Sequence, residues 1–280
     1  MRALSKPNLL LIATLLHAPV EAEDKQLAGH LITVWSGDLP IILTAPHGGR
    51  QAVPGVGARR GVGVPQFTVE RDSNTAELAE MVADKTAERL AAKPFVVIAR
   101  FERKYIDANR AEAAAFESPA AKVHYDAYHQ AIEAAVQAVR QKWGGGLLID
   151  IHGQGAEAET IFRGTDNGKS VSGLEQRFGR DAIMGPKSIL GWLAAKGHKI
   201  EPGVGDDRER RYTGGYTTRT YGSRGAGGID AVQLELGTAL RARSNLARTA
   251  SDLAEAIAVF VESFLLRSEI PVRAPAAANP

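Results

Sequence analysis

Residues 41–49, IILTAPHGG, and residues 147–153, LLIDIHG, follow one pattern, in which an apolar run ends at a histidine and glycine comes next. Continuous apolar runs of this length are typical of strands that are buried on both faces of a sheet. In open α/β sheets, functional groups gather just beyond the carboxyl ends of the strands. A core or turn position is the ordinary interpretation of either histidine alone. Because both end a strand in the same way, we expect His47 and His152 to converge on one point.

Strands and helices alternate outward from these two stretches. Further strands are expected at 30–35, 95–101 and 230–237, and helices at 73–92, 120–143, 172–179, 189–197 and 245–267. The run at 30–35 and the run at 39–45 are predicted to form an opening strand pair. Such alternation predicts an α/β fold with three αβα layers and a mixed, mostly parallel sheet. The sequence contains no repeat or linker that divides it, so we expect a single domain.

Composition excludes some classes of function. The chain has 280 residues, of which 44% are hydrophobic and 24% charged, and its formal net charge is +2. A charge so close to zero gives no electrostatic footprint for nucleic acid. The chain has no cysteine, so it must fold without disulfides, and any metal must be bound by His, Asp or Glu.

The first 22 residues are typical of a secretory signal peptide. Arg2 and Lys6 precede the apolar run LLLIATLLHAPV, and small residues before Glu23 mark a cleavage site. A permanent anchor is the alternative, but the apolar run is short for a membrane span. We expect a signal peptide at 1–22, a mature domain at 23–270, and a disordered tail at 271–280. The protein is expected to be periplasmic or secreted, with no stable membrane anchor after the signal is removed.

Two histidines that converge on one point could bind a metal ion. The third ligand is then expected to be a carboxylate, because zinc sites that catalyse hydrolysis commonly combine two histidines with one Asp or Glu. Asp72 lies at the start of the helix expected at 73–92, and Glu70 lies two residues earlier. Either of them is a candidate. Asp72 is also a good N-cap for that helix, and the two roles are compatible.

Two further stretches suit a site of this kind. RKYIDANR, residues 103–110, brings two arginines close to the end of the strand at 95–101, and arginine forks bind carboxylates. This segment could therefore hold an acidic substrate. Glu235 lies inside the apolar strand at 230–237, where an unpaired carboxylate is costly. It is either a general base that faces a cleft or the partner of a structural arginine.

Seven motifs occur along the chain in a recognisable order: PHGG, RDSNTAEL, KYIDANR, YDAYHQAI, LLIDIHG, GGYTTRTYG and AVQLELG. Together they resemble the N-formylglutamate amidohydrolase family, which is related to the zinc carboxypeptidases and to aspartoacylase. The resemblance covers about residues 40–243 and implies a zinc-carboxypeptidase-like (phosphorylase/hydrolase-like) fold.

The resemblance also implies a role for each candidate residue. His47, Asp72 and His152 correspond to the ligands of one Zn(II) ion. Glu235 corresponds to the general base, and Arg103 resembles the arginine that steadies the developing oxyanion. Substrate carboxylates would be bound by Asn109, Arg110 and Arg219.

The sequence departs from the pattern of the relatives at one point. Zinc carboxypeptidases carry their first histidine and carboxylate within an H-x-x-E turn, whereas 24 residues separate His47 from Asp72 here, so Glu70 stays open as a ligand.

The expected function is hydrolysis of a C–N amide bond in a small acidic substrate. N-formylglutamate hydrolysis belongs to cytoplasmic histidine breakdown, whereas this chain is expected to be exported. The substrate is therefore expected to be an acidic N-acyl amino acid or a γ-glutamyl or cell-wall peptide. The alternative is a non-catalytic periplasmic protein that binds carboxylate ligands through Arg103, Arg110 and Arg219.

Overall fold

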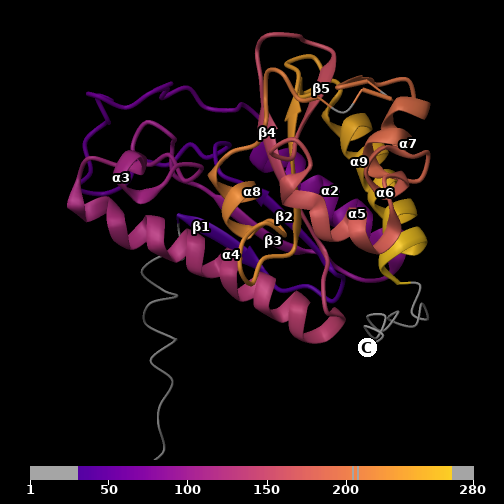
Figure 1. The fold of residues 1–280 in the computed structure, drawn as a ribbon. Coiled ribbons are helices and arrows are strands. Elements are labelled where there is room, and N and C mark those ends of the chain that lie inside the picture. The colour runs from indigo at the N-terminus through magenta and orange to yellow at the C-terminus, as the bar shows by residue number, and fades with distance from the viewer. Residues whose placement is uncertain (1–30, 204, 207, 267–280) are drawn as a thin grey trace, which may run out of the picture.

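The computed structural model describes residues 31–203, 205–206 and 208–266. The expected signal peptide and the expected tail lie outside this part of the chain. The described residues form three layers, with one sheet in the middle and helices on both of its faces (Figure 1). Among them, no helix is both long enough and apolar enough to cross a membrane. The α/β architecture predicted from the sequence is confirmed.

Seven strands form the sheet, in the spatial order β1-β3-β2-β4-β7-β5-β6. Their bounds are β1 Ile32–Trp35, β2 Ile41–Ala45, β3 Phe95–Ala99, β4 Leu147–Gly153, β5 Thr160–Gly164, β6 Lys199–Glu201 and β7 Asp230–Leu236. The four central strands β3, β2, β4 and β7 are parallel to one another, whereas β1 and β5 pair antiparallel with β3 and β7. The sheet is therefore mixed and mostly parallel, as predicted.

The predicted opening strand pair is wrong, because β3 lies between β1 and β2. The segment that joins β1 to β2 crosses the start of β3, where the backbone N–H groups of Asp38 and Leu39 donate to the carbonyl of Lys93 at 2.8 and 3.0 Å. β1 is a partly exposed edge strand, whereas every residue of β2 is buried. A strand that is buried along its whole length is stable only inside the sheet, so β2 pairs with β3 and β4 instead.

The helices divide between the two faces of the sheet. The longest are α2 Thr75–Leu90, α4 Lys122–Trp143 and α9 Leu246–Phe260, which continues as the π-turn η3 Val261–Leu265. The shorter ones are α3 Glu112–Ala115, η1 Pro119–Ala121, η2 Lys169–Val171, α5 Ser172–Phe178, α6 Asp181–Met184, α7 Ile189–Ala195 and α8 Tyr216–Tyr221. α2, α5, α6, α7 and α9 pack on one face, whereas α4 and α8 pack on the other.

The two cores share the central strands through their alternating side chains. On β2, Ile41 and Leu43 point into the core beneath α2 and α9, while Ile42 points toward α4. All three are fully buried, and each such side chain contributes about 1.5–3 kcal/mol to folding. The double burial makes the carboxyl ends of β2 and β4 a rigid support for the residues that follow them.

Candidate active site

His47 lies two residues beyond the end of β2 and is 1% exposed. Steric crowding explains why the two residues after it are glycines. A Cβ at Gly48 would collide with the backbone of Ala76 in α2, and a Cβ at Gly49 would collide with the backbone of Arg100 after β3. The PHGG turn therefore lets the chain pass between a helix and a strand, and it holds the histidine ring at the edge of the sheet.

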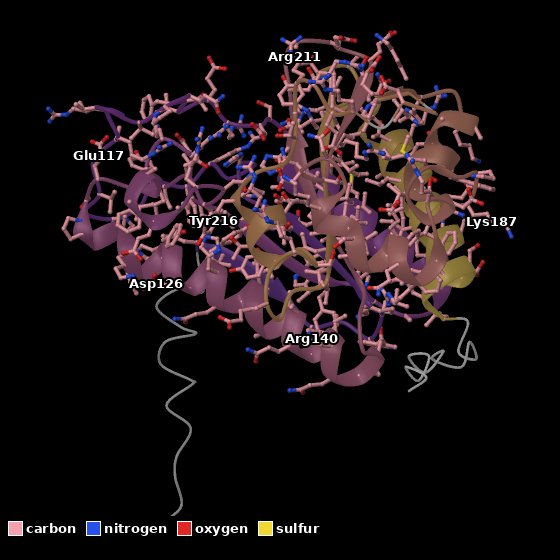
Figure 2. All side chains as sticks on the ribbon, in the orientation of Figure 1. Glu117, Asp126, Arg140, Lys187, Arg211 and Tyr216 are labelled. Atoms are coloured by element: carbon pink, nitrogen blue, oxygen red, sulfur yellow. The ribbon has the colours of Figure 1, made fainter. Side chains whose placement is uncertain are left out.

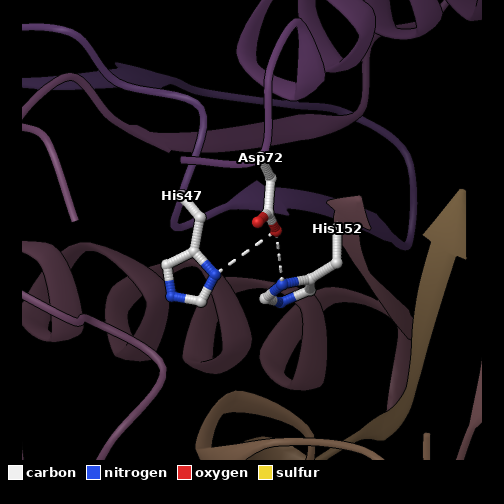
Figure 3. Close-up of side chains that lie close together, drawn as sticks. All are labelled: His47, Asp72 and His152. Carbon is white, nitrogen blue, oxygen red and sulfur yellow. Dashed lines mark hydrogen bonds and ion pairs between the residues drawn. The ribbon is translucent and has the colours of Figure 1, made fainter. Parts of the chain in front are cut away.

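His152 lies near the end of β4, directly opposite Glu235 in the β4–β7 register, and it is 2% exposed. Asp72 completes a cluster with the two histidines (Figure 3). Its Oδ2 atom lies 3.4 Å from Nδ1 of His47 and 3.2 Å from Nδ1 of His152. The structure thus brings together the two histidines and the carboxylate that the resemblance implied.

Asp72 and Glu70 take different positions. Glu70 is exposed and lines the same cleft, but it is outside the cluster formed by Asp72 and the two histidines. Asn74, and not Asp72, occupies the N-cap position of α2. The side chain of Asp72 is therefore available to a metal, and its Oδ2 also accepts the backbone N–H of Gly153 at 3.0 Å.

The cluster fits a zinc ion by two observations. His47 Nδ1 is a buried atom with no hydrogen-bond partner. The two ligand separations of 3.4 and 3.2 Å also match tetrahedral zinc, since ligand bonds of about 2.0–2.1 Å imply a separation of about 3.3 Å between neighbouring ligand atoms. The three side chains could therefore hold zinc with little rearrangement.

Two buried aspartates contact the histidine rings at the nitrogen that does not face Asp72. Nε2 of His47 lies 2.7 Å from Asp107 Oδ1, and Nε2 of His152 lies 2.9 Å from Asp150 Oδ2. Nδ1 of each ring faces Asp72, and it would be the atom that binds a metal when the ring carries its proton on Nε2. Partners of this kind fix the tautomer and orientation of metal-binding histidines. The sequence analysis gave neither aspartate a role, although Asp107 belongs to the RKYIDANR stretch and Asp150 precedes His152 by two residues on the same strand face.

The carboxylates of the site divide into two electrostatic groups. Burial raises the pKa of Asp72 and of Asp107, but the histidines outweigh this effect and lower both pKa values below the usual range. The Glu235 carboxyl behaves differently, since burial raises its pKa and the opposing effect of His152 is smaller. The pKa values of Asp72 and Asp107 are thus shifted down, whereas that of Glu235 is shifted up.

Glu235 lies on β7 beside the cluster, 8% exposed, and accepts a hydrogen bond from Gln233 Nε2 at 2.8 Å. It forms no ion pair with an arginine in the described part of the chain, so the structural ion pair considered from the sequence is not found there. A carboxylate at this position beside the cluster of His47, Asp72 and His152 is a candidate general base.

The residues of the KYIDANR motif lie next to the cluster. Arg103 donates from Nε to Asp107 Oδ2 at 3.0 Å, and its Nη1 lies 3.8 Å from Asp72 Oδ1. Asn109 places its side-chain nitrogen 3.1 Å from Nε2 of His152. Arg110 donates to the carbonyl of Gln66 at 2.8 Å.

The eight residues to which the resemblance gave roles and the alternative ligand Glu70 all line one cleft of about 880 Å³. The cleft lies at the carboxyl ends of β4 and β7 and extends under the loops that follow them. Three further arginines line it that the sequence analysis did not identify: Arg71, Arg211 and Arg241. No spacing pattern links these three in the sequence.

Helix α8 forms part of the cleft wall and is attached to α4. Its Tyr221 hydroxyl lies 2.9 Å from Nδ1 of His129, and burial lowers the pKa of His129 to about 4. Thr217 donates its backbone N–H to Asn109 Oδ1 at 2.8 Å. α8 thus connects the exposed Arg219, a cleft residue, to Asn109 beside the cluster.

Comparison with known proteins supports the resemblance noted in the sequence. The sequence profile of the N-formylglutamate amidohydrolase family matches residues 114–241, a span that contains His152, Arg219 and Glu235. No curated protein matches the chain. The predicted resemblance to this family is confirmed.

Solved structures share the fold. An N-formylglutamate amidohydrolase from Ralstonia eutropha JMP134 superposes with a TM-score of 0.59 at 18% identity, covering 84% of this chain and 98% of that one. A gene product from Agrobacterium tumefaciens gives a TM-score of 0.56 at 15% identity, with 85% and 97% covered. At these identities the likeness establishes the fold alone.

Proposed function

We propose that this chain, whose residues 114–241 match the N-formylglutamate amidohydrolase profile, is a zinc-dependent hydrolase of C–N amide bonds in small acidic substrates. The substrates we propose are acidic N-acyl amino acids and γ-glutamyl or cell-wall peptides. One observation carries the proposal. The buried ligand atoms of His47, Asp72 and His152 converge in an arginine-lined cleft, and Glu235 lies on the adjacent strand.

Zinc held by these three residues would polarise the amide carbonyl as a Lewis acid and would acidify a water molecule. The carboxylate of Glu235 would accept a proton from the attacking water and pass it to the nitrogen of the leaving amine. Burial supports this role, because it raises the pKa of Glu235 and makes its carboxylate a stronger base than an exposed one.

Arginines position the substrate around this centre. Arg103 is held by Asp107, so its remaining N–H groups can stabilise negative charge that develops on the carbonyl oxygen. Arg110 and Asn109 orient a substrate carboxylate, and Arg219 extends the same positive surface. The negative charge of an acidic substrate would therefore be balanced by these arginines, next to the amide bond that is hydrolysed.

A binding protein without catalysis is the second candidate, and Glu235 argues against it. An anion that binds next to a buried carboxylate loses affinity through repulsion. A buried carboxylate at the position of Glu235 is useful as a general base in a hydrolase, whereas in a receptor for carboxylates it would only weaken binding. The hydrolase hypothesis therefore accounts for more of the cleft.

The test is hydrolysis of a panel of N-formyl, N-acyl and γ-glutamyl amides by purified protein, with and without chelator. The Glu235→Gln variant keeps the side-chain size but cannot accept the proton. We expect it to retain zinc and substrate affinity while turnover falls at least about a hundredfold. Glu70→Gln, which changes an exposed carboxylate of the same cleft, is the matched control and should stay within about twofold of wild type. Undiminished hydrolysis by Glu235→Gln would refute the mechanism.

A further inference from the structure

The cleft contains more positive charge than the proposed chemistry uses. Six arginines line it, against the three carboxylates of Glu70, Asp72 and Glu235. Half of these arginines are engaged by the protein itself. Arg103 bonds to Asp107, Arg110 to the carbonyl of Gln66, and the buried Arg241 to the carbonyls of Leu236, Ser73 and Gln154.

The other three arginines are Arg71, Arg211 and Arg219, and none of them forms an ion pair within the described part of the chain. Arg71 Nη1 is a buried atom with no hydrogen-bond partner, and Nη2 reaches only Ser73 Oγ at 3.4 Å. Arg211 lies over the ring of Tyr212, with 5.8 Å from its guanidinium carbon to the ring centre. Unpaired guanidinium groups in one cleft repel one another, so an anionic ligand would stabilise them.

The segment that carries Arg211 is fixed by a buried anchor two residues earlier. Glu209 is 4% exposed, and its carboxylate accepts hydrogen bonds from Arg163 Nε and from the backbone N–H of Asn167, each at 2.9 Å. The backbone N–H of Thr165 donates to the same carboxylate at 2.8 Å. Arg211 is labelled at the top of the molecule in Figure 2. A buried anchor of this kind holds the backbone before Arg211 in place, so the position of Arg211 in the cleft wall is set by the fold.

We propose that Arg71 and Arg211 bind additional carboxylates of an elongated acidic substrate, such as an oligomer of γ-linked glutamate. This inference rests on the proposed hydrolase function and extends it beyond the residues that hold the carboxylate next to the scissile amide. The size of the cleft supports it. A drug-sized ligand occupies a pocket of about 300–1,000 Å³, and the volume of about 880 Å³ here far exceeds the need of a single N-formyl amino acid.

The test compares three ligands that share one scissile formamide. They are N-formylglutamate, an N-formyl γ-linked triglutamate, and the same triglutamate with the two added carboxylates converted to amides. For the wild type, kcat/KM should be highest for the charged trimer. In Arg71→Gln/Arg211→Gln this preference over the amidated trimer should fall at least about tenfold, mainly through KM. Arg208→Gln removes an exposed arginine of the same loop that does not line the cleft, and it should keep the preference.

Calorimetric binding of the same ligands to Glu235→Gln protein, with and without the two arginine substitutions, separates this inference from the proposed function. Selective binding of the charged trimer that depends on the two arginines, without hydrolysis of any ligand by the wild type, would support the subsite and refute the hydrolase. Hydrolysis with no loss of preference in the double variant would refute the subsite alone. Zinc content is measured in each variant because Arg71 neighbours Asp72, and equal loss on all three ligands at full zinc content would also contradict the subsite.

Discussion

His47 and His152 each commit one ring nitrogen to a buried aspartate and present the other to Asp72. The two histidines could be found from the sequence because each follows an apolar strand. Their supporting aspartates could not. Asp107 lies 60 residues from His47, so the contact exists only after folding. The sequence could not decide between Glu70 and Asp72 as the metal ligand either. That choice depends on which of the two side chains the loop before α2 directs toward the histidines.

Asp107 should act on the metal through His47. Asp107→Asn keeps the shape of the side chain but removes the negative charge that fixes the histidine tautomer. Partners of this kind typically account for about 10–100-fold in metal affinity. We therefore expect zinc affinity, measured by competition with a chromogenic chelator, to fall by about that factor.

The control for this experiment is Asp84→Asn, which changes an exposed aspartate on α2 and should leave zinc affinity unchanged. A circular dichroism spectrum and melting temperature confirm that each variant is folded. Unaltered zinc affinity in folded Asp107→Asn protein would show that His47 is oriented without this carboxylate.

At the scale of elements, the three long helices, the short helices α5 and α7 and most strands were predicted, whereas β5, β6 and α8 were not. α2, α4 and α9 all lie within the helices expected from their apolar periodicity. α8 has only six residues, β6 has three, and neither was expected. Elements this short are stabilised by their neighbours and not by local propensity. In α8 the neighbours are His129 and Asn109, and both contacts link distant parts of the chain.

The contact between α4 and α8 predicts a pH dependence of stability. Burial lowers the pKa of His129 to about 4 in the folded protein, below the 6.5 of an exposed histidine. The unfolded chain therefore binds the proton more readily. The stability associated with neutral His129 is complete above the unfolded pKa and is lost as the pH falls toward the folded one. The ring is partly exposed, so we expect a loss of about 1–2 kcal/mol between about pH 7 and pH 5.

Urea unfolding of the zinc-free protein across this pH range measures the effect. His129→Gln should be less stable at neutral pH, and its free energy of unfolding should fall less steeply with acid than that of the wild type. His124→Gln, on the same helix, is the control, because the pKa of His124 is lowered less than that of His129. Identical pH slopes for the wild type and His129→Gln would contradict the buried-histidine account.

At the scale of the whole molecule, the fold gathers a cleft from segments that span residues 47–241. The sequence predicted the layers and the mostly parallel sheet, because strand and helix periodicities alternate along the chain. It did not predict that β3 separates β1 from β2. Strand order depends on which strands pair edge to edge through their backbone hydrogen bonds. The residue pattern within one strand does not indicate which strand will be its neighbour. Arg71, Arg211 and Arg241 were not predicted either, because they are far apart in the sequence and come to line one cleft only after folding.

The central claim is that His47, Asp72 and His152 bind one zinc ion that hydrolysis requires, and metal stoichiometry tests it most directly. Purified protein is stripped with chelator and titrated with zinc in the wild-type, Asp72→Ala and Glu70→Ala forms, and bound metal is measured by atomic emission. We expect one equivalent in the wild type and in Glu70→Ala, and loss of most of it in Asp72→Ala. Full occupancy in folded Asp72→Ala, or loss in Glu70→Ala instead, would contradict the account.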